Sequence, residues 1–188
     1  FRYSKFLDFI DSVDNAIVST NANIRLRKTF VPNLTGINTY TLKFNHKIQR
    51  LGSVTDTVQN NAYGCLTSSQ FQYAGYNSYF DDNGYGTLRI YYLTGVNGVS
   101  SRVYTNTTSG KIDYETGSVT ISSFVPASYV GSEISVVVSP ISPNIIPIRN
   151  QIILMSQTIV NIIDDNTGRT VAVSSNVDTM GQTTTLLT

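Results

Sequence analysis

Several residue types are scarce in this chain of 188 residues, which has one cysteine, one histidine and no tryptophan. A single cysteine cannot form an internal disulfide, so we expect Cys65 to be a small buried hydrophobic side chain. A closed zinc site needs three or four Cys or His ligands, and Cys65 and His46 cannot supply them within one subunit. The sequence therefore predicts no cofactor and no structural metal.

Charge is also scarce, because Lys, Arg, Asp and Glu make up 13% of the chain and nearly cancel to a net charge of +1. Such a balance gives no electrostatic reason to expect nucleic-acid binding. It also weakens the repulsion between copies, which favours association. The longest apolar stretch, residues 145–163, is interrupted by proline and polar residues, and a membrane span needs ~18 consecutive apolar residues. We therefore expect neither nucleic acid nor a membrane as a partner.

Residues that suit strands and turns are abundant. Ser, Thr and Asn form about a third of the chain, alongside 12 Tyr and 8 Phe. From Ser69 onward, turn signals recur every 8–12 residues between short runs of β-forming residues, which is typical of a β-sandwich or meander. The sequence Asp81-Asp82-Asn83-Gly84 is a hairpin turn signal. Separate strands are predicted at 87–93, 102–105, 111–114 and 118–124.

The opening residues follow a different pattern. Apolar side chains recur there at three- and four-residue spacing, which predicts a helix within residues 1–19. We therefore expect an α+β fold, mainly β, with the N-terminal helix packed on an antiparallel β-sandwich or meander and a C-terminal β hairpin or extended tail. Three parts are predicted: residues 1–68 with the helix and short strands, 69–144 with the antiparallel β module, and 145–188 with the hairpin and tail. The chain starts with Phe rather than Met, so we expect it to be a piece of a longer protein.

No arrangement of residues indicates catalysis. The only histidine, His46, follows a predicted strand, and no Gly-x-Ser-x-Gly motif occurs. Asp113 and Glu115 lie two apart and could serve as paired carboxylates for glycoside hydrolysis, but Glu115-Thr116-Gly117 is a turn signal, in which acidic side chains are solvated. The acidic clusters 81–84 and 164–166 lack the spacing of a calcium loop. We expect no enzyme and no small-molecule substrate.

Two stretches are candidates for partner binding. Residues 21–50 contain six Lys or Arg and no Asp or Glu, which fits either a solvated face or a docking patch for an acidic surface. The stretch 145–163 is unusually apolar, and a terminal hairpin from 159 to 173 would have an edge that could pair with a neighbouring chain. The candidate partner-binding residues are Arg25, Arg27, Lys28, Ile145, Arg149, Ile159 and Ile162.

Several sequence blocks, taken together, resemble the C-terminal region of the large baseplate wedge protein of T4-like contractile-tailed bacteriophages, a family related to J-type baseplate proteins. The blocks occur in the order of that family and cover most of the chain to about residue 155. They are Arg2-Tyr-Ser-Lys-Phe-Leu-Asp-Phe-Ile-Asp-Ser-Val-Asp14, Asn23-Ile-Arg-Leu-Arg-Lys28, Tyr79-Phe-Asp-Asp-Asn-Gly84, Thr87-Leu-Arg-Ile-Tyr-Tyr92, Gly110-Lys-Ile-Asp-Tyr-Glu-Thr-Gly117 and Ile145-Ile-Pro-Ile-Arg-Asn-Gln-Ile152.

The resemblance implies a structural subunit of the virion that connects baseplate wedges into a ring around the central hub. It implies contacts with a second copy and with other wedge proteins, a location in the tail baseplate after synthesis in the host cytoplasm, and no catalytic residues. The alternative that the residues leave open is a receptor- or glycan-binding β module of a tail fibre or adhesin. A fibre module would be expected to form trimers and to expose clusters of aromatic side chains.

Overall fold

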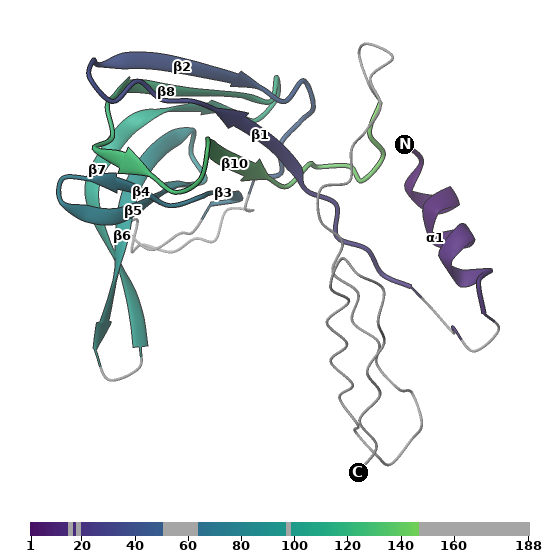
Figure 1. Cartoon of the computed structure of the whole chain (residues 1–188). Coiled ribbons are helices and arrows are strands. Elements are labelled where there is room, and N and C mark those ends of the chain that lie inside the picture. Colours follow the sequence, from purple (N-terminus) through teal and green to yellow (C-terminus); the bar gives the residue numbers. More distant parts are fainter. Residues whose placement is uncertain (15–16, 18–19, 51–63, 97–98, 147–188) are drawn as a thin grey trace. The chain divides into compact units, whose positions relative to one another are not determined.

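The computed structural model describes residues 1–14, 17, 20–50, 64–96 and 99–146 (Figure 1). The chain divides into two compact units, Phe1–Arg149 and Asn150–Thr188, and the second lies outside the described residues. The hairpin predicted for residues 159–173 therefore lies outside them as well. The first unit is mainly β with one helix at its N-terminus, which confirms the expected α+β class.

The helix α1 (Tyr3–Asp11) confirms the helical spacing of the opening residues but is shorter than the interval 1–19. The helix ends at Asp11, and the hydroxyl of the next residue, Ser12, donates to the carbonyl oxygen of Phe9 at 2.8 Å. This hydrogen bond competes with the backbone hydrogen bonds that would continue the helix. The N–H of Tyr3 donates to Oδ1 of Asn144 at 2.9 Å. No residue of α1 is buried among the residues that the structure describes.

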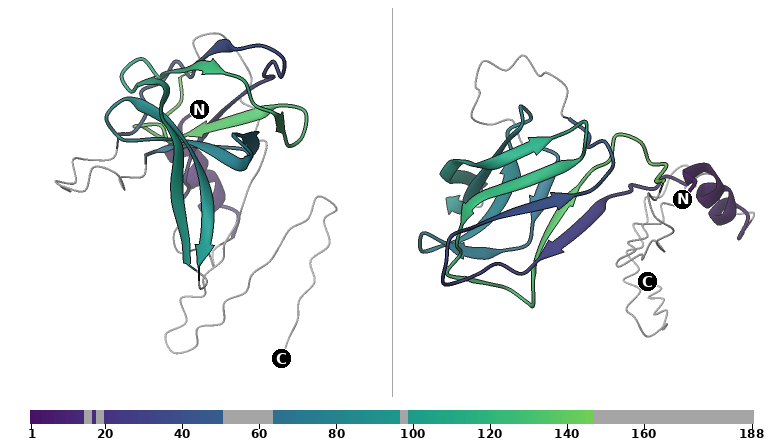
Figure 2. Two further views of the ribbon diagram at one scale, coloured as in Figure 1. Left: turned by 90° about the vertical axis from the view of Figure 1, so that its left-hand side faces the viewer. Right: turned by 90° about the horizontal axis from the view of Figure 1, so that it is seen from above.

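Within the described residues, ten strands form two antiparallel sheets (Figures 1 and 2). The smaller sheet has the order β1-β10-β3 and the larger one has the order β2-β8-β7-β6-β5-β4-β9. The strands are β1 (Leu26–Phe30), β2 (Asn38–Lys43), β3 (Leu66–Ser68), β4 (Phe71–Tyr73), β5 (Tyr76–Asp82), β6 (Thr87–Val96), β7 (Val99–Asp113), β8 (Ser118–Phe124), β9 (Ser128–Tyr129) and β10 (Ile134–Val138).

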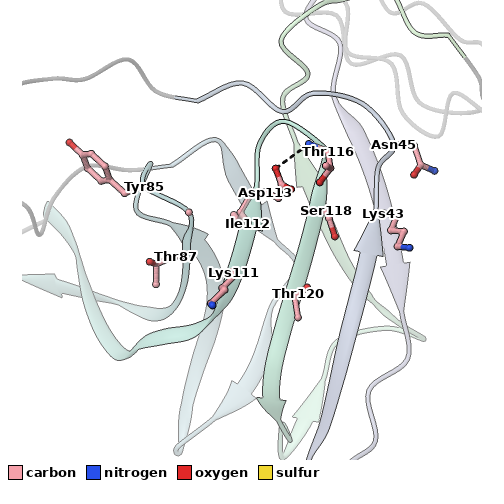
Figure 3. Close-up of a pocket in the computed structure, with 11 residues that line it drawn as sticks. Lys43, Asn45, Tyr85, Thr87, Lys111, Ile112, Asp113, Thr116, Ser118 and Thr120 are labelled. Carbon is pink, nitrogen blue, oxygen red and sulfur yellow. Dashed lines mark hydrogen bonds between the residues drawn. The ribbon is translucent and has the colours of Figure 1, made fainter.

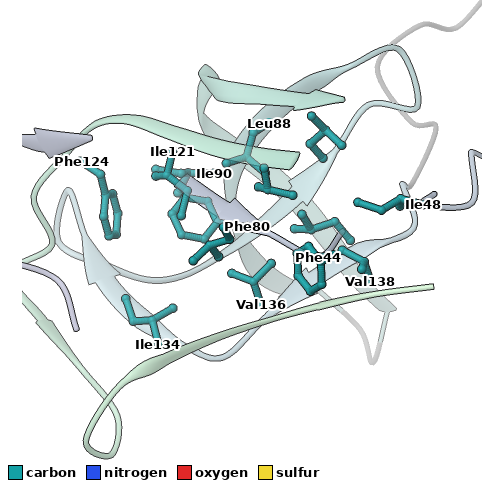
Figure 4. Packing of buried hydrophobic residues seen from close by; sticks show 14 of the residues in the cluster. Phe44, Ile48, Phe80, Leu88, Ile90, Ile121, Phe124, Ile134, Val136 and Val138 are labelled. Carbon is teal, nitrogen blue, oxygen red and sulfur yellow. The ribbon is translucent and has the colours of Figure 1, made fainter. Parts of the chain in front are cut away.

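The two sheets share one hydrophobic core (Figure 4). Burial alternates along β10, where Ile134, Val136 and Val138 are buried and the residues between them are half-buried. This period of two is what a strand with one face on the core requires. From the larger sheet, Phe124 packs against Phe80 with ring centroids 5.0 Å apart. The core fixes the inner face of both sheets, so alternate residues of the same strands point outward.

Strand β7 changes its neighbours along its length. It pairs with β6 from Val99 to Lys111, but with β8 only from Gly110 to Asp113. The register with β6 shifts twice between Leu88 and Tyr91, and such bulges bend a strand. Beyond Tyr92, the last residue of β6 that pairs with β5, the β6–β7 hairpin continues as a two-stranded projection (Figures 1 and 2). Residues 91–96 and 99–104 of this hairpin are here named the β arm.

The β arm corrects the sequence prediction of separate strands at 102–105 and 111–114. Both belong to the single 15-residue strand β7, and its 105–109 segment accommodates the register shifts without ending the strand. Within this segment Asn106 pairs with Ile90 of β6, and the residues on either side of that pair lie in the two bulges. The turn predicted at Glu115-Thr116-Gly117 is confirmed, because the N–H of Gly117 donates to the carbonyl of Asp113 at 2.9 Å and Gly117 has a φ of 69°.

Candidate functional site

A depression of the described surface lies over the outward face of β2, β8 and β7, beside the β5–β6 turn (Figure 3). It is open to solvent, with a volume of about 860 Å³. Its lining is mostly polar and combines two ammonium groups, several hydroxyls and one carboxylate. The residues that define its character are Lys43, Lys111, Asp113, Thr116, Ser118 and Thr120.

The strand register brings these side chains together. Lys43 lies opposite Ser118 in the β2–β8 pair, and Lys111 lies opposite Thr120 in the β7–β8 pair. Directly opposed residues of antiparallel strands point to the same face of the sheet. Because Ile112 on β7 points into the core, its neighbour Lys111 points outward. No ion pair forms at either lysine within the described residues.

The carboxylate of this depression belongs to the turn between β7 and β8. Oδ1 of Asp113 accepts the backbone N–H groups of Glu115 at 3.0 Å and Thr116 at 3.1 Å. Hydrogen bonds from Thr116, followed by that of Glu115, hold the pKa of Asp113 below its ordinary value. Glu115 forms an exposed ion pair with Lys47. Both carboxylates are thus held by groups of the chain itself, Asp113 by backbone N–H groups and Glu115 by Lys47.

A second polar cluster lies at the base of the β arm. Asp81 on β5 accepts hydrogen bonds from Nε of Arg89 at 3.0 Å, from Nη1 of Arg102 at 2.9 Å and from the hydroxyl of Tyr104 at 2.9 Å. The guanidinium of Arg89 lies over the Tyr104 ring at 4.2 Å from its centroid, and that of Arg102 lies over the Tyr91 ring at 4.4 Å. We name Asp81, Arg89, Tyr91, Arg102 and Tyr104 the arm-base cluster.

Burial governs the electrostatics of the arm-base cluster. The side chain of Asp81 is 1% exposed and that of Arg89 is 5% exposed. Burial raises the pKa of Asp81, and the hydrogen bond and positive charge of Arg89 oppose this shift. Burial and then the charge of Asp81 raise the pKa of Tyr104 to about 12. The cluster therefore joins β5, β6 and β7 through charge-assisted hydrogen bonds that water does not screen.

The acidic run 81–84 is only partly a turn, which corrects the sequence prediction. Asp81 and Asp82 belong to β5 and are both buried. The carboxylate of Asp82 accepts the N–H of Leu66 at 2.9 Å and the hydroxyl of Tyr114 at 2.6 Å, so it ties the start of β3 to the end of β7. The turn itself starts at Asn83, whose Oδ1 accepts the backbone N–H of Tyr85 at 2.9 Å. No local pattern signals the partners of Asp82, because they are distant along the chain.

Four of the seven predicted partner-binding residues lie in the described part of the chain. Arg25 precedes β1, Arg27 and Lys28 lie on it, and all three are exposed. Ile145 is half-buried and forms two backbone hydrogen bonds with Phe1, of 2.9 Å and 3.2 Å. The basic residues and Ile145 thus belong to different elements. The other three, Arg149, Ile159 and Ile162, lie outside the described residues.

Sequence reasoning missed two surface features. Phe9 on α1 and Val13, which follows the helix, are 70% and 69% exposed, although both are large apolar side chains. Residues 99–109 of β7 have β6 on one side and no strand of the described chain on the other. A strand of 15 residues could have been suspected from the absence of proline between residues 33 and 125.

Comparison with known proteins gives no relative, because no family model, no curated protein and no solved structure matches the chain. In the described ranges, no three His, Cys, Asp or Glu side chains are grouped so that they could hold a metal ion. The helical residues of that same part include no segment with the length and hydrophobicity of a membrane span. Function is therefore inferred from the surface and packing of the chain itself.

Proposed function

We propose that the chain is a structural subunit of a phage tail baseplate wedge. In this role it connects wedges into a ring around the hub, through contacts with a second copy and with other wedge proteins. The sequence blocks between residues 2 and 152 that resemble the T4-like wedge protein support this class. The location that this proposal implies for the chain is the tail of the virion.

The observation that carries the proposal is the exposure of α1, none of whose residues is buried. Phe9 lies on α1 and Val13 lies two residues beyond its end at Asp11, and both side chains are about 70% exposed. An amphipathic helix gains most of its stability from packing its apolar side. A helix with no buried residue therefore fits a subunit whose neighbour supplies the missing cover.

A second apolar surface supports the same role. The connection between β1 and β2 exposes Val31, Leu34 and Ile37, three large apolar side chains within seven residues. Single exposed apolar residues are ordinary, but a cluster of them is typical of an interaction surface. Such a cluster on a connection would be covered in an assembly.

The same account proposes that the chain has no catalytic turnover. Four carboxylates of the β strands and their turns already hold structure: Asp81 binds Arg89, Asp82 binds Tyr114, Asp113 caps its own turn and Glu115 pairs with Lys47. A catalytic acid or base must instead face a substrate. The positions of these four carboxylates suit a protein with an assembly role.

Immunogold electron microscopy tests the proposed location. Antibodies raised against the chain would be applied to purified particles of the phage whose genome encodes it, with antibody preabsorbed on the chain as the control. The account predicts gold at the distal end of the tail. Gold along the fibres, or particles that lack the chain, would contradict it.

A second candidate function, receptor or glycan binding by a fibre or adhesin, is favoured by the depression in Figure 3. Its hydroxyls and lysines could bind sugar hydroxyl and acidic groups, and the exposed Tyr85 ring at its rim could stack on a sugar. A glycan array probed with the full chain separates the candidates. Binding that is lost in both Tyr85→Ala and Lys111→Ala would favour this function over the wedge.

A further inference from the structure

The free edge of β7 is the longest unpaired strand edge in the described part of the chain. Residues 99–104 and Asn106 pair with β6 on one side, whereas pairing with β8 begins only at Gly110. An unpaired strand edge presents backbone N–H and C=O groups that are able to bind another strand. A strand of another chain could therefore pair with this edge of the β arm.

The outer edges of the two sheets are protected by the usual means, and this edge is not. The outer strand β1 carries Arg27 and Lys28, the outer strand β2 ends at Lys43, and the outer strands β3 and β9 have three and two residues. Charge, lysine and short length all discourage edge pairing. Residues 99–109 contain no proline, lysine or acidic residue, and their one charged side chain, Arg102, is bound to Asp81.

The β arm is also held in one orientation. The arm-base cluster fixes β7 to β5 and β6 through the hydrogen bonds that Asp81 accepts from Arg89, Arg102 and Tyr104. On the opposite face, the rings of Tyr76 and Tyr92 stack with centroids 4.1 Å apart. A strand that is already ordered loses little conformational freedom when it binds. The edge is therefore preorganised for a partner.

We infer that the occupant of this edge is the same edge of a second copy, so that two β arms join antiparallel into one four-stranded sheet. The inference rests on the proposed function, for which it supplies the contact between two copies. A two-fold axis at Val103 places Val103 of one copy beside Val103 of the other, and Arg102 opposite Tyr104. Val103 is 38% exposed in the single chain, so the contact would bury it.

Self-pairing is favoured because the edge does not repel itself in this register. Arg102 is the only charge of residues 99–109, and its guanidinium already binds the buried carboxylate of Asp81 at 2.9 Å. An axis one residue earlier would oppose the two Arg102 side chains, and like charges directly opposite destabilise a strand pair. The position of this single charge therefore excludes the register centred on Arg102 and is compatible with the one centred on Val103, whose exposed apolar side chain that register would bury.

A charge-swap experiment tests the inference on the full chain. Val103→Glu and Val103→Lys each place like charges together at the axis, so sedimentation velocity should show a dimer dissociation constant about 100-fold weaker for each variant alone. An equimolar mixture of the two variants should restore the dimer as a heterodimer, which a misfolded chain could not do. The matched control is Leu93→Glu, an exposed apolar position on the β6 side of the arm, which should leave the dimer intact.

Two results would overturn the inference. One is a wild-type chain that stays monomeric at high micromolar concentration, and the other is a dimer that neither Val103 variant weakens. The second result would leave the wedge proposal standing with a different contact between copies. Failure of the wedge proposal would instead appear in the immunogold experiment, whatever the sedimentation shows.

Discussion

At the scale of single residues, the molecule depends most on the buried carboxylate of Asp81. It accepts hydrogen bonds from Arg89, Arg102 and Tyr104, which come from two strands other than its own. A buried charge is tolerated because these partners replace the water that it lost. Removing one member would leave the others buried without compensation. A substitution in the cluster should therefore lower the free energy of unfolding more than its position outside the hydrophobic core suggests.

The substitution Asp81→Asn should therefore destabilise the fold by roughly 3–5 kcal/mol, because Arg89 would remain buried without a counter-charge. The matched control is Glu115→Gln, which removes the exposed carboxylate paired with Lys47 and should cost about 1 kcal/mol or less. Urea unfolding of the three proteins measures both effects. Equal losses in the two variants would contradict the structural role of the arm-base cluster.

Tyr104 gives the cluster a pH dependence at the alkaline end. Burial and Asp81 raise its pKa from 10.0 to about 12, so between these values the unfolded chain binds fewer protons than the folded one. Stability should therefore be complete below pH 10 and fall as the pH rises through about 12. In Tyr104→Phe this part of the decline should disappear. Unfolding midpoints measured at pH 9, 10 and 11 would refute the assignment if both proteins declined with the same slope.

At the scale of elements, the decisive feature is the point where β7 begins to pair with β8. Gly110 lies there, and a Cβ atom added to it would come within 2.0 Å of the carbonyl oxygen of Thr120. Only glycine lets the two backbones approach so closely. The close approach of β7 and β8 at this point therefore depends on one residue without a side chain.

Gly110→Ala should destabilise the fold by about 1–3 kcal/mol, since the strands must separate to admit the methyl group. Gly95→Ala is the matched control, because Gly95 lies on the β arm and a methyl group added there would meet no other atom within 4 Å. It should leave the melting temperature unchanged or slightly higher. Similar melting temperatures for the two variants would show that β7 and β8 do not approach as described.

Local patterns explain how much of these elements could be predicted. The spacing of apolar residues predicted α1, and the turn residues predicted the hairpins at Asn83-Gly84 and Gly117, because each signal lies within a few residues. The order β1-β10-β3 could not be predicted in this way, since β1 and β10 are separated by about 100 residues of sequence. The burial of Asp81 was missed for the same reason: its partner Arg102 lies 21 residues away.

At the scale of the whole molecule, the surface explains the proposed function better than any single site does. The uncovered side of α1, the apolar connection 31–37 and the free edge of β7 lie on three different elements. A chain with a net charge of +1 has little repulsion to keep such surfaces apart. We therefore expect the chain to act by joining its neighbours, with the polar depression of Figure 3 as a feature of the same surface.

Cross-linking mass spectrometry of intact phage particles tests this central claim most directly. Lys5 lies on α1 and is exposed, so a lysine-reactive reagent reports what contacts that helix in the assembled particle. The account predicts cross-links from Lys5 to other tail proteins, and their loss when the particles are dissociated before reaction. Particles in which Lys5 is cross-linked only to lysines of its own chain would contradict it.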